Sequence, residues 1–331
     1  MYAEGRQQGT SPTPVSADRM VRLLESLLPQ GEFSEQKGHG LGDEVTPSPS
    51  AELLFDQGHR AAKVTVALSR FSVPAPPQFL DCPDTAYHPY SQCTRTVMPG
   101  GAILVQDRSP KDQDRPAGNE LLTVLITHED GRQVFASATA APDDGGEATS
   151  ATLPLTLEQL TAVAVSPSWK RVLAVMPAPS EGPRTESVPR MTGQQISHVI
   201  AKLLPSGLST ASEGGSVGFG HIVVNDGRGE SLVAANVQRW KPEDPSMRKL
   251  FERADTLPDG TRLSVRQGPA SGGDGAIAWT VDTFRKDGLR VVITAVNARA
   301  FRLPAGRSEP ALNTEQLRQM ALDAAWEEPS R

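Results

Sequence analysis

Long apolar runs are missing from this chain. No stretch reaches the roughly 18–20 apolar residues that a helix needs to cross a bilayer. The polar residues 1–8 also lack the apolar segment of a signal peptide. The chain therefore carries no predicted transmembrane segment. Either the protein is cytosolic, or a targeting segment precedes Met1 and is not part of this chain.

Motifs for catalysis and cofactor binding are missing as well. The glycine-rich stretch 215–220 does not match the dinucleotide-binding or phosphate-loop patterns. The G-x-S-x-G spacing occurs at 214–218, but no strand is expected to lead into a helix there, as a nucleophile elbow requires. The histidines are scattered, without the paired spacing of a metal site. We therefore expect no enzyme activity, no cofactor and no metal site. A hydrolase with a non-standard site remains as an alternative.

Charge of one sign is not in large excess. The net charge of −6 argues against a track for nucleic-acid phosphates, because such tracks are basic. The chain has 331 residues, of which only 37% are hydrophobic, and it contains 29 glycines and 28 prolines. This composition predicts two modest cores with many loops.

The chain does contain a long internal repeat. Residues 122–169 recur as residues 279–326 at a constant offset. Each copy has an Asp-Gly pair, which predicts a two-residue type I′ hairpin, and then a helix that ends at a tryptophan. A period of this length indicates domain duplication, because solenoid repeats are shorter. The two turns are Asp130-Gly131 and Asp287-Gly288.

Each repeat is predicted to be an α+β domain with the order α-β-β-β-β-β-α. Alternating apolar residues and short turns indicate an antiparallel, roughly five-stranded sheet. We expect an N-terminal and a C-terminal helix to pack on one face of it. The predicted organisation is a disordered leader (1–15), a first repeat (16–172), a proline-rich linker (173–190) and a second repeat (191–329).

Three of the predicted helices begin with a capping-box signature, in which two side chains satisfy the first free backbone groups. We expect Trp169 and Trp326, which occupy equivalent positions, to pack in the two cores, with ligand stacking as the alternative. The capping pairs are Thr156 with Gln159, Thr192 with Gln195, and Asn313 with Gln316.

Cys82 and Cys93 lie in an insertion that the second repeat lacks. Zinc requires four closely spaced ligands and only His88 is near, so we predict a disulfide, with a buried reduced pair as the alternative. A disulfide indicates an oxidising compartment. Tyr87, His88 and Tyr90 lie between the cysteines and form a candidate recognition loop. They could equally fold back onto the edge of the sheet.

With this loop, the Asp-Gly hairpins and the Glu-Gln-Leu helices in view, the chain resembles the extracytoplasmic tandem domains of actinobacterial membrane-anchored proteins or lipoproteins. The resemblance implies a location at the cell envelope and no particular activity. Because the predicted disulfide places the chain outside the cytosol, we expect a targeting or tethering segment upstream of Met1.

The resulting hypothesis is a non-catalytic extracytoplasmic binding or sensing module, tethered to the cell envelope. Its partner would be an unknown protein or envelope ligand, and not a nucleic acid. An exposed sheet face or the cleft between the domains would be the contact surface. A structural or self-associating envelope protein is the main alternative.

Overall fold

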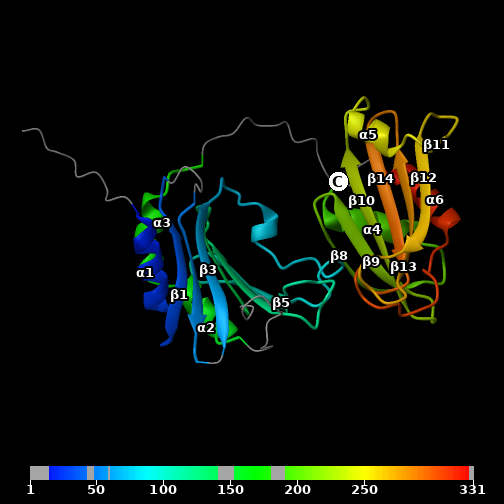
Figure 1. Cartoon of the computed structure of the whole chain (residues 1–331). Helices are drawn as coiled ribbons and strands as arrows, with labels where there is room; N and C mark the ends of the chain where they lie inside the picture. The colour runs from blue at the N-terminus through cyan, green and yellow to red at the C-terminus, as the bar shows by residue number, and fades with distance from the viewer. Residues whose placement is uncertain (1–14, 43–47, 59, 141–152, 180–190, 328–331) are drawn as a thin grey trace, which may run out of the picture. The chain divides into compact units, whose positions relative to one another are not determined.

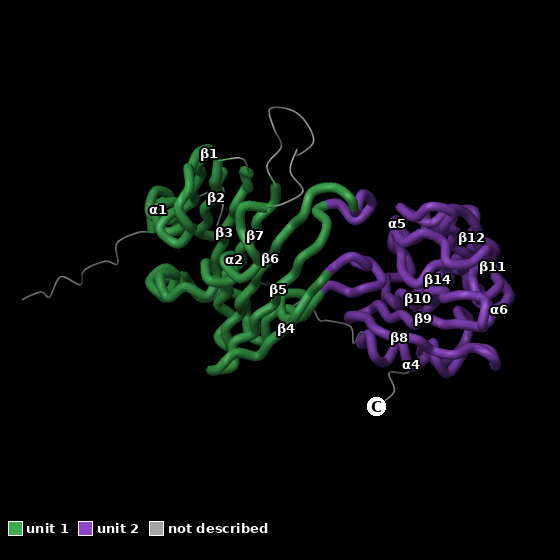
Figure 2. Tube along the Cα trace, turned by 90° about the horizontal axis from the view of Figure 1, so that it is seen from below, with its two compact units in different colours: residues 1–82, 92–111, 117–182 green, residues 83–91, 112–116, 183–331 purple. Residues whose placement is uncertain are grey.

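The computed structural model describes residues 15–42, 48–58, 60–140, 153–179 and 191–327. It divides into two compact units, and each of them contains one sheet (Figure 1). Residues 1–14 of the predicted leader and 180–190 of the predicted linker lie outside the described residues. Unit 1 comprises residues 1–82, 92–111 and 117–182, and unit 2 comprises residues 83–91, 112–116 and 183–331 (Figure 2).

Unit 1 contains a seven-stranded antiparallel sheet with the order β1-β2-β3-β7-β6-β5-β4. Helix α1 (Ala17–Leu27) packs on β1 and β2, and α2 (Leu157–Ala164) packs on β5, β6 and β7. A 3₁₀ turn η2 (Pro167–Trp169) leads into α3 (Lys170–Val175), which enters the segment predicted as linker. The strands are β1 (Glu32–His39), β2 (Ser50–Asp56), β3 (Ala61–Arg70), β4 (Gln92–Val97), β5 (Ile103–Pro110), β6 (Glu120–Thr127) and β7 (Arg132–Ala140).

Unit 2 contains a second seven-stranded antiparallel sheet, with the order β11-β12-β13-β14-β10-β9-β8. Helix α4 (Gly193–Leu203) packs on β8, β9 and β10, and α6 (Thr314–Leu322) packs on β13 and β14. The short helix α5 (Pro245–Leu250) follows β10. The strands are β8 (Ser209–Ser216), β9 (Phe219–Asn225), β10 (Glu230–Arg239), β11 (Asp255–Thr256), β12 (Arg262–Pro269), β13 (Ile277–Phe284) and β14 (Leu289–Val296).

The two sheets share one connectivity. When the strands of each unit are taken in chain order, the first three lie side by side, and the seventh, sixth, fifth and fourth follow in that sequence. The prediction of tandem α+β units with antiparallel sheets is therefore confirmed. The number of strands was wrong, because each sheet has seven rather than about five.

The missed strands lie at the sheet edges or next to loops. In β1, β4 and β8 most residues are exposed, so no buried face imposes apolar alternation on the sequence. The strand β11 has only two residues. The predicted helix complement was also incomplete, since α3 and α5 are too short to show a helical period.

The buried faces follow the predicted alternation. In β3 the side chains of Ala62, Val64, Val66 and Leu68 are fully buried against the helices, while their neighbours are not. Trp169 and Trp326 are 1% and 2% exposed, which confirms them as core residues. All three capping boxes are present as predicted.

The two Asp-Gly turns differ from the predicted type I′ hairpin. Among the described residues only the glycines have a positive φ there, at 80° for Gly131 and 85° for Gly288. The N–H of Gly288 donates to the carbonyl of Arg285, and that of Arg285 donates to Leu289. This is a longer loop with a glycine bulge. A Cβ at Gly288 would collide with the carbonyl oxygen of Trp240.

Candidate functional site

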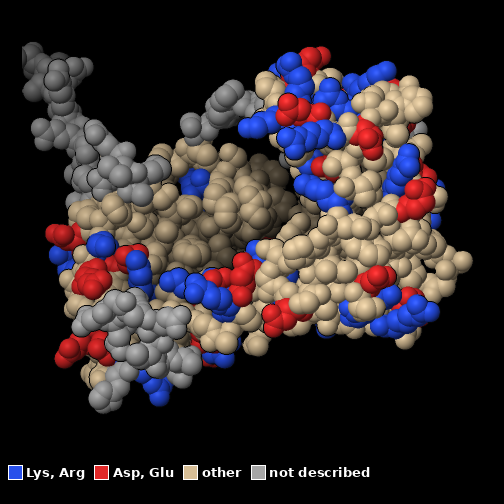
Figure 3. Space-filling model, turned by 45° about the vertical axis from the view of Figure 1, so that its right-hand side comes forward, with Lys and Arg blue, Asp and Glu red and all other residues tan. Residues whose placement is uncertain are grey.

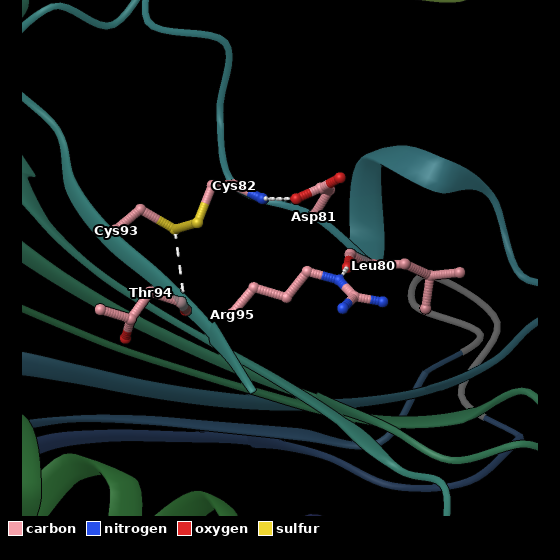
Figure 4. Close-up of a disulfide and its surroundings, with 6 residues drawn as sticks. All are labelled: Leu80, Asp81, Cys82, Cys93, Thr94 and Arg95. Carbon is pink, nitrogen blue, oxygen red and sulfur yellow. Dashed lines mark hydrogen bonds between the residues drawn. A yellow bond between two sulfur atoms is a disulfide. The ribbon is translucent and has the colours of Figure 1, made fainter. Parts of the chain in front are cut away.

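The sulfur atoms of Cys82 and Cys93 are bonded, and their Cα atoms lie 5.7 Å apart, so the predicted disulfide is confirmed (Figure 4). The backbone on either side is held locally. The N–H of Cys82 donates to Oδ1 of Asp81 at 2.9 Å, and Nε of Arg95 donates to the carbonyl of Leu80 at 2.8 Å. Both cysteines belong to unit 1, but residues 83–91 between them belong to unit 2 (Figure 2).

The loop 83–91 packs on the sheet face of unit 2 that faces away from α4 and α6. The ring of Tyr87 lies 4.8 Å from the ring of Phe219 and 4.9 Å from that of Phe301. Ala86 is 1% exposed and joins the same apolar cluster. The N–H of Phe301 donates to the carbonyl of Ala86 at 2.9 Å. Tyr87, a predicted recognition residue, is thus used for packing within unit 2.

Charged groups fix the loop further. Oδ1 of Asp84 lies 3.3 Å from Nδ1 of His221, whose side chain is 3% exposed, although the two atoms lack hydrogen-bond geometry. Burial lowers the pKa of His221, because it penalises the imidazolium, and the negative charge of Asp84 opposes this shift. Arg302 donates from Nη1 to the carbonyl of Tyr87 and from Nε to Oδ1 of Asp114, both at 2.8 Å. Arg302 therefore contacts both of the short segments that unit 2 draws from the first half of the chain, residues 83–91 and 112–116.

His88 and Tyr90, the other two residues of the predicted recognition loop, are partly exposed. The N–H of His88 donates to the carbonyl of Asp84, and the N–H of Ser91 donates to that of His88. These bonds give the loop a turn structure of its own. Recognition by this loop stays a prediction.

The same sheet face carries a polar network beyond the loop. Arg290 donates to both carboxylate oxygens of Asp282, at 3.0 and 2.7 Å, and Asp282 is 2% exposed. The guanidinium carbon of Arg290 lies 6.0 Å from the centroid of the Phe251 ring. The side-chain oxygen of Gln238 accepts from Arg290 at 3.2 Å and from Nε1 of Trp240 at 2.9 Å. The orientation of Trp240 is thus tied to a buried ion pair.

A hollow of 290 Å³ lies beside Trp240 and is lined by residues 217–219 and 236–240. Two of its apolar side chains are open to solvent, since Val217 is 51% and Trp240 is 37% exposed. Asn236 and Gln238 contribute uncharged amides. Because the ring of Phe219, which lines this hollow, packs against the ring of Tyr87, the disulfide loop supports one wall of the hollow, which we call the Trp240 groove.

The sequence did not reveal the Trp240 groove. Its residues come from the turn between β8 and β9 and from the end of β10, and no local pattern unites them. The glycine-rich stretch 215–220, rejected above as a nucleotide motif, forms that turn. The available signal was a tryptophan placed directly after an alternating strand, at Arg239-Trp240.

Within the part of the chain that the structure describes, no helix is both long and apolar enough to cross a membrane. No group of three or more metal-ligating side chains comes together among the described residues.

No family model matches the chain. No curated protein matches it either. Three solved structures align along most of its length. "Crystal structure of MucB in complex with MucA(peri)" has 10% identity and covers 93% of this chain and 97% of that one, with a TM-score of 0.19. The MucA/MucB complex of Pseudomonas aeruginosa has 12% identity, the same coverages and a TM-score of 0.19. DynU16, from the dynemicin biosynthetic locus, has 12% identity, covers 94% and 91%, and has a TM-score of 0.11. Scores this low do not establish a shared fold.

Proposed function

We propose that this protein is a non-catalytic binding or sensing module that contacts a partner protein through the Trp240 groove. The observation that supports this proposal most strongly is the pairing of exposed apolar side chains, Val217 and Trp240, with a fixed polar wall. Exposed tryptophans in a defined hollow are the residues that most often dominate protein–protein binding energy.

The chemistry of the groove indicates the class of ligand. The Gln238 oxygen accepts from two donors of this chain. No partner for its amide N–H₂ is found among the described residues, so this group can donate to a carbonyl oxygen of the partner. The nearby Arg239 is neutralised by Asp287 at 3.0 Å. An uncharged segment that places an apolar side chain on Trp240 and a backbone carbonyl at Gln238 fits this arrangement.

The disulfide supports an extracytoplasmic location, because disulfides persist in oxidising compartments. Tethering to the cell envelope belongs to the same proposal, and it draws on the resemblance to actinobacterial membrane-anchored proteins. The anchor would lie outside the described residues.

A pull-down from envelope extract with the immobilised full chain tests this proposal. Trp240→Ala should reduce capture of the partner at least tenfold, since truncating a dominant interface residue costs about 2 kcal/mol or more. Val265→Ala is the matched control, because Val265 is 46% exposed on the same unit but lies outside the groove.

Wild type and Val265→Ala should capture the same protein. A capture pattern that Trp240→Ala leaves unchanged would contradict the role of the groove. Concentration-dependent dimers in sedimentation, with no captured protein, would support the self-associating alternative instead.

A further inference from the structure

A second hollow of unit 2, of 510 Å³, lies beside α5 and carries an excess of positive charge. Arg248 and Lys249 from α5 and Arg262 from β12 all line it. Glu252 is the one carboxylate in its lining. The whole chain has a net charge of −6, so the local charge of this hollow is opposite in sign to that of the chain. We call this hollow the α5 hollow.

The three cations of the α5 hollow form no ion pair within the described residues. No ion pair is found for Arg248, Lys249 or Arg262 among the described residues, and Arg248 donates only to the backbone carbonyl of Glu243, at 3.0 Å. Elsewhere in unit 2, Arg290 and Arg307 are each paired with a carboxylate. The positive charge of the α5 hollow is therefore available to a ligand.

The elements that carry these cations are fixed to the sheet. The buried side chains of Met247 and Phe251 hold α5 against Phe284, and the two phenyl rings lie 5.6 Å apart. Arg262 is opposite Phe284 in the strand pairing, and its backbone also pairs with Thr256 of β11. Charges held on regular elements lose less conformational freedom on binding than charges on loops.

The surroundings of the α5 hollow favour a membrane over a soluble ion. Leu250 follows the two cations in α5 and is 44% exposed. Arg266 lies on the same face of β12 as Arg262 and is also exposed. In Figure 3, lysine and arginine side chains gather on unit 2, with Asp and Glu side chains among them. An exposed leucine among cations is the composition of a surface that meets lipid headgroups.

We infer that the α5 hollow binds the phosphate of an anionic phospholipid headgroup, with Leu250 entering the boundary of the acyl chains. This inference does not depend on the Trp240 groove. Because the rest of the chain has a net negative charge, an anionic membrane would attract the α5 hollow and repel the remainder of the protein surface. Binding would therefore also orient unit 2 on the membrane.

Vesicle co-sedimentation of the full chain tests this inference. The probes are phosphatidylcholine vesicles with and without phosphatidylglycerol. The variant Arg248→Gln/Lys249→Gln/Arg262→Gln should bind the anionic vesicles roughly 100-fold more weakly, since each basic residue near such a surface contributes about fivefold. High salt should weaken wild-type binding by screening.

The matched control is Arg22→Gln/Lys170→Gln/Arg171→Gln. It removes the same charge from exposed positions of unit 1 and should bind like the wild type. Equal losses in the two triple variants, or no wild-type preference for the anionic vesicles, would overturn the inference.

Leu250→Ala and inorganic phosphate separate the two sources of a phosphate group. If the lipid is the ligand, Leu250→Ala should weaken vesicle binding several-fold, and phosphate should not displace the vesicles beyond its effect on ionic strength. If Leu250→Ala has no effect and phosphate competes specifically, the site takes a soluble phosphate and the membrane inference fails. Trp240→Ala should leave vesicle binding unchanged, so this result is independent of the proposed function.

Discussion

Replacing Tyr87 by alanine tests whether the disulfide loop is folded as part of unit 2. The substitution removes two ring contacts, with Phe219 and Phe301, at centroid distances of 4.8 and 4.9 Å. Each aromatic pair contributes about 0.5–1.5 kcal/mol beyond area burial. Because Tyr87 is only partly buried, we expect a loss of about 2–3 kcal/mol in the local stability of this region.

Hydrogen exchange at the amide of Phe301 reports this loss directly, since that N–H donates to the carbonyl of Ala86. A loss of about 2–3 kcal/mol corresponds to exchange roughly 30–160-fold faster. A local probe is needed, because two units need not unfold as one cooperative transition. Tyr90→Ala is the control: it lies on the same loop, and no ring contact is found for it among the described residues. If exchange at Phe301 responds equally to both variants, or to neither, the reasoning is refuted.

Three further predictions concern the stability of the units. Gly288→Ala should destabilise unit 2 by about 2 kcal/mol or more in denaturant unfolding, because the positive φ disfavours alanine and its Cβ would collide with Trp240; an effect below about 0.5 kcal/mol would be inconsistent with this turn. Replacing both cysteines by serine should cost about 2–3 kcal/mol and raise hydrogen exchange in residues 83–91, and unchanged protection there would show that the disulfide does not constrain the loop. Burial lowers the pKa of His221, so unit 2 should keep its full stability above about pH 6.5 and lose it as the pH falls below that unfolded-state value; His221→Gln should flatten the decline between about pH 7 and 5, and parallel curves would contradict this assignment.

The sequence predicted those parts of the fold that leave a local trace. The alternation in β3 reflects burial mainly on one face, and the capping boxes at Thr192 and Asn313 reflect the first turn of a helix. The strands β1 and β4 leave no such trace, because most of their residues are exposed. The alternating pattern of a strand reflects the burial of its side chains more than the intrinsic β-propensity of its residues.

The disulfide and its loop show the same limit for the site. Two cysteines in one insertion were enough to predict their bond. Nothing around Tyr87 indicates that its partners are Phe219 and Phe301, because these residues meet only through the tertiary fold. The Trp240 groove has the same origin, since its walls come from the β8–β9 turn and the end of β10, which the sheet brings together.

The most direct test of the central proposal is site-specific photo-cross-linking in envelope preparations, with a benzophenone side chain placed at Val217. This position is in the Trp240 groove and is 51% exposed. The account predicts a discrete protein adduct at Val217 that Trp240→Ala abolishes, and no such adduct from the same group placed at Val265. Equal adducts from both positions, or an adduct at Val217 that survives Trp240→Ala, would contradict it.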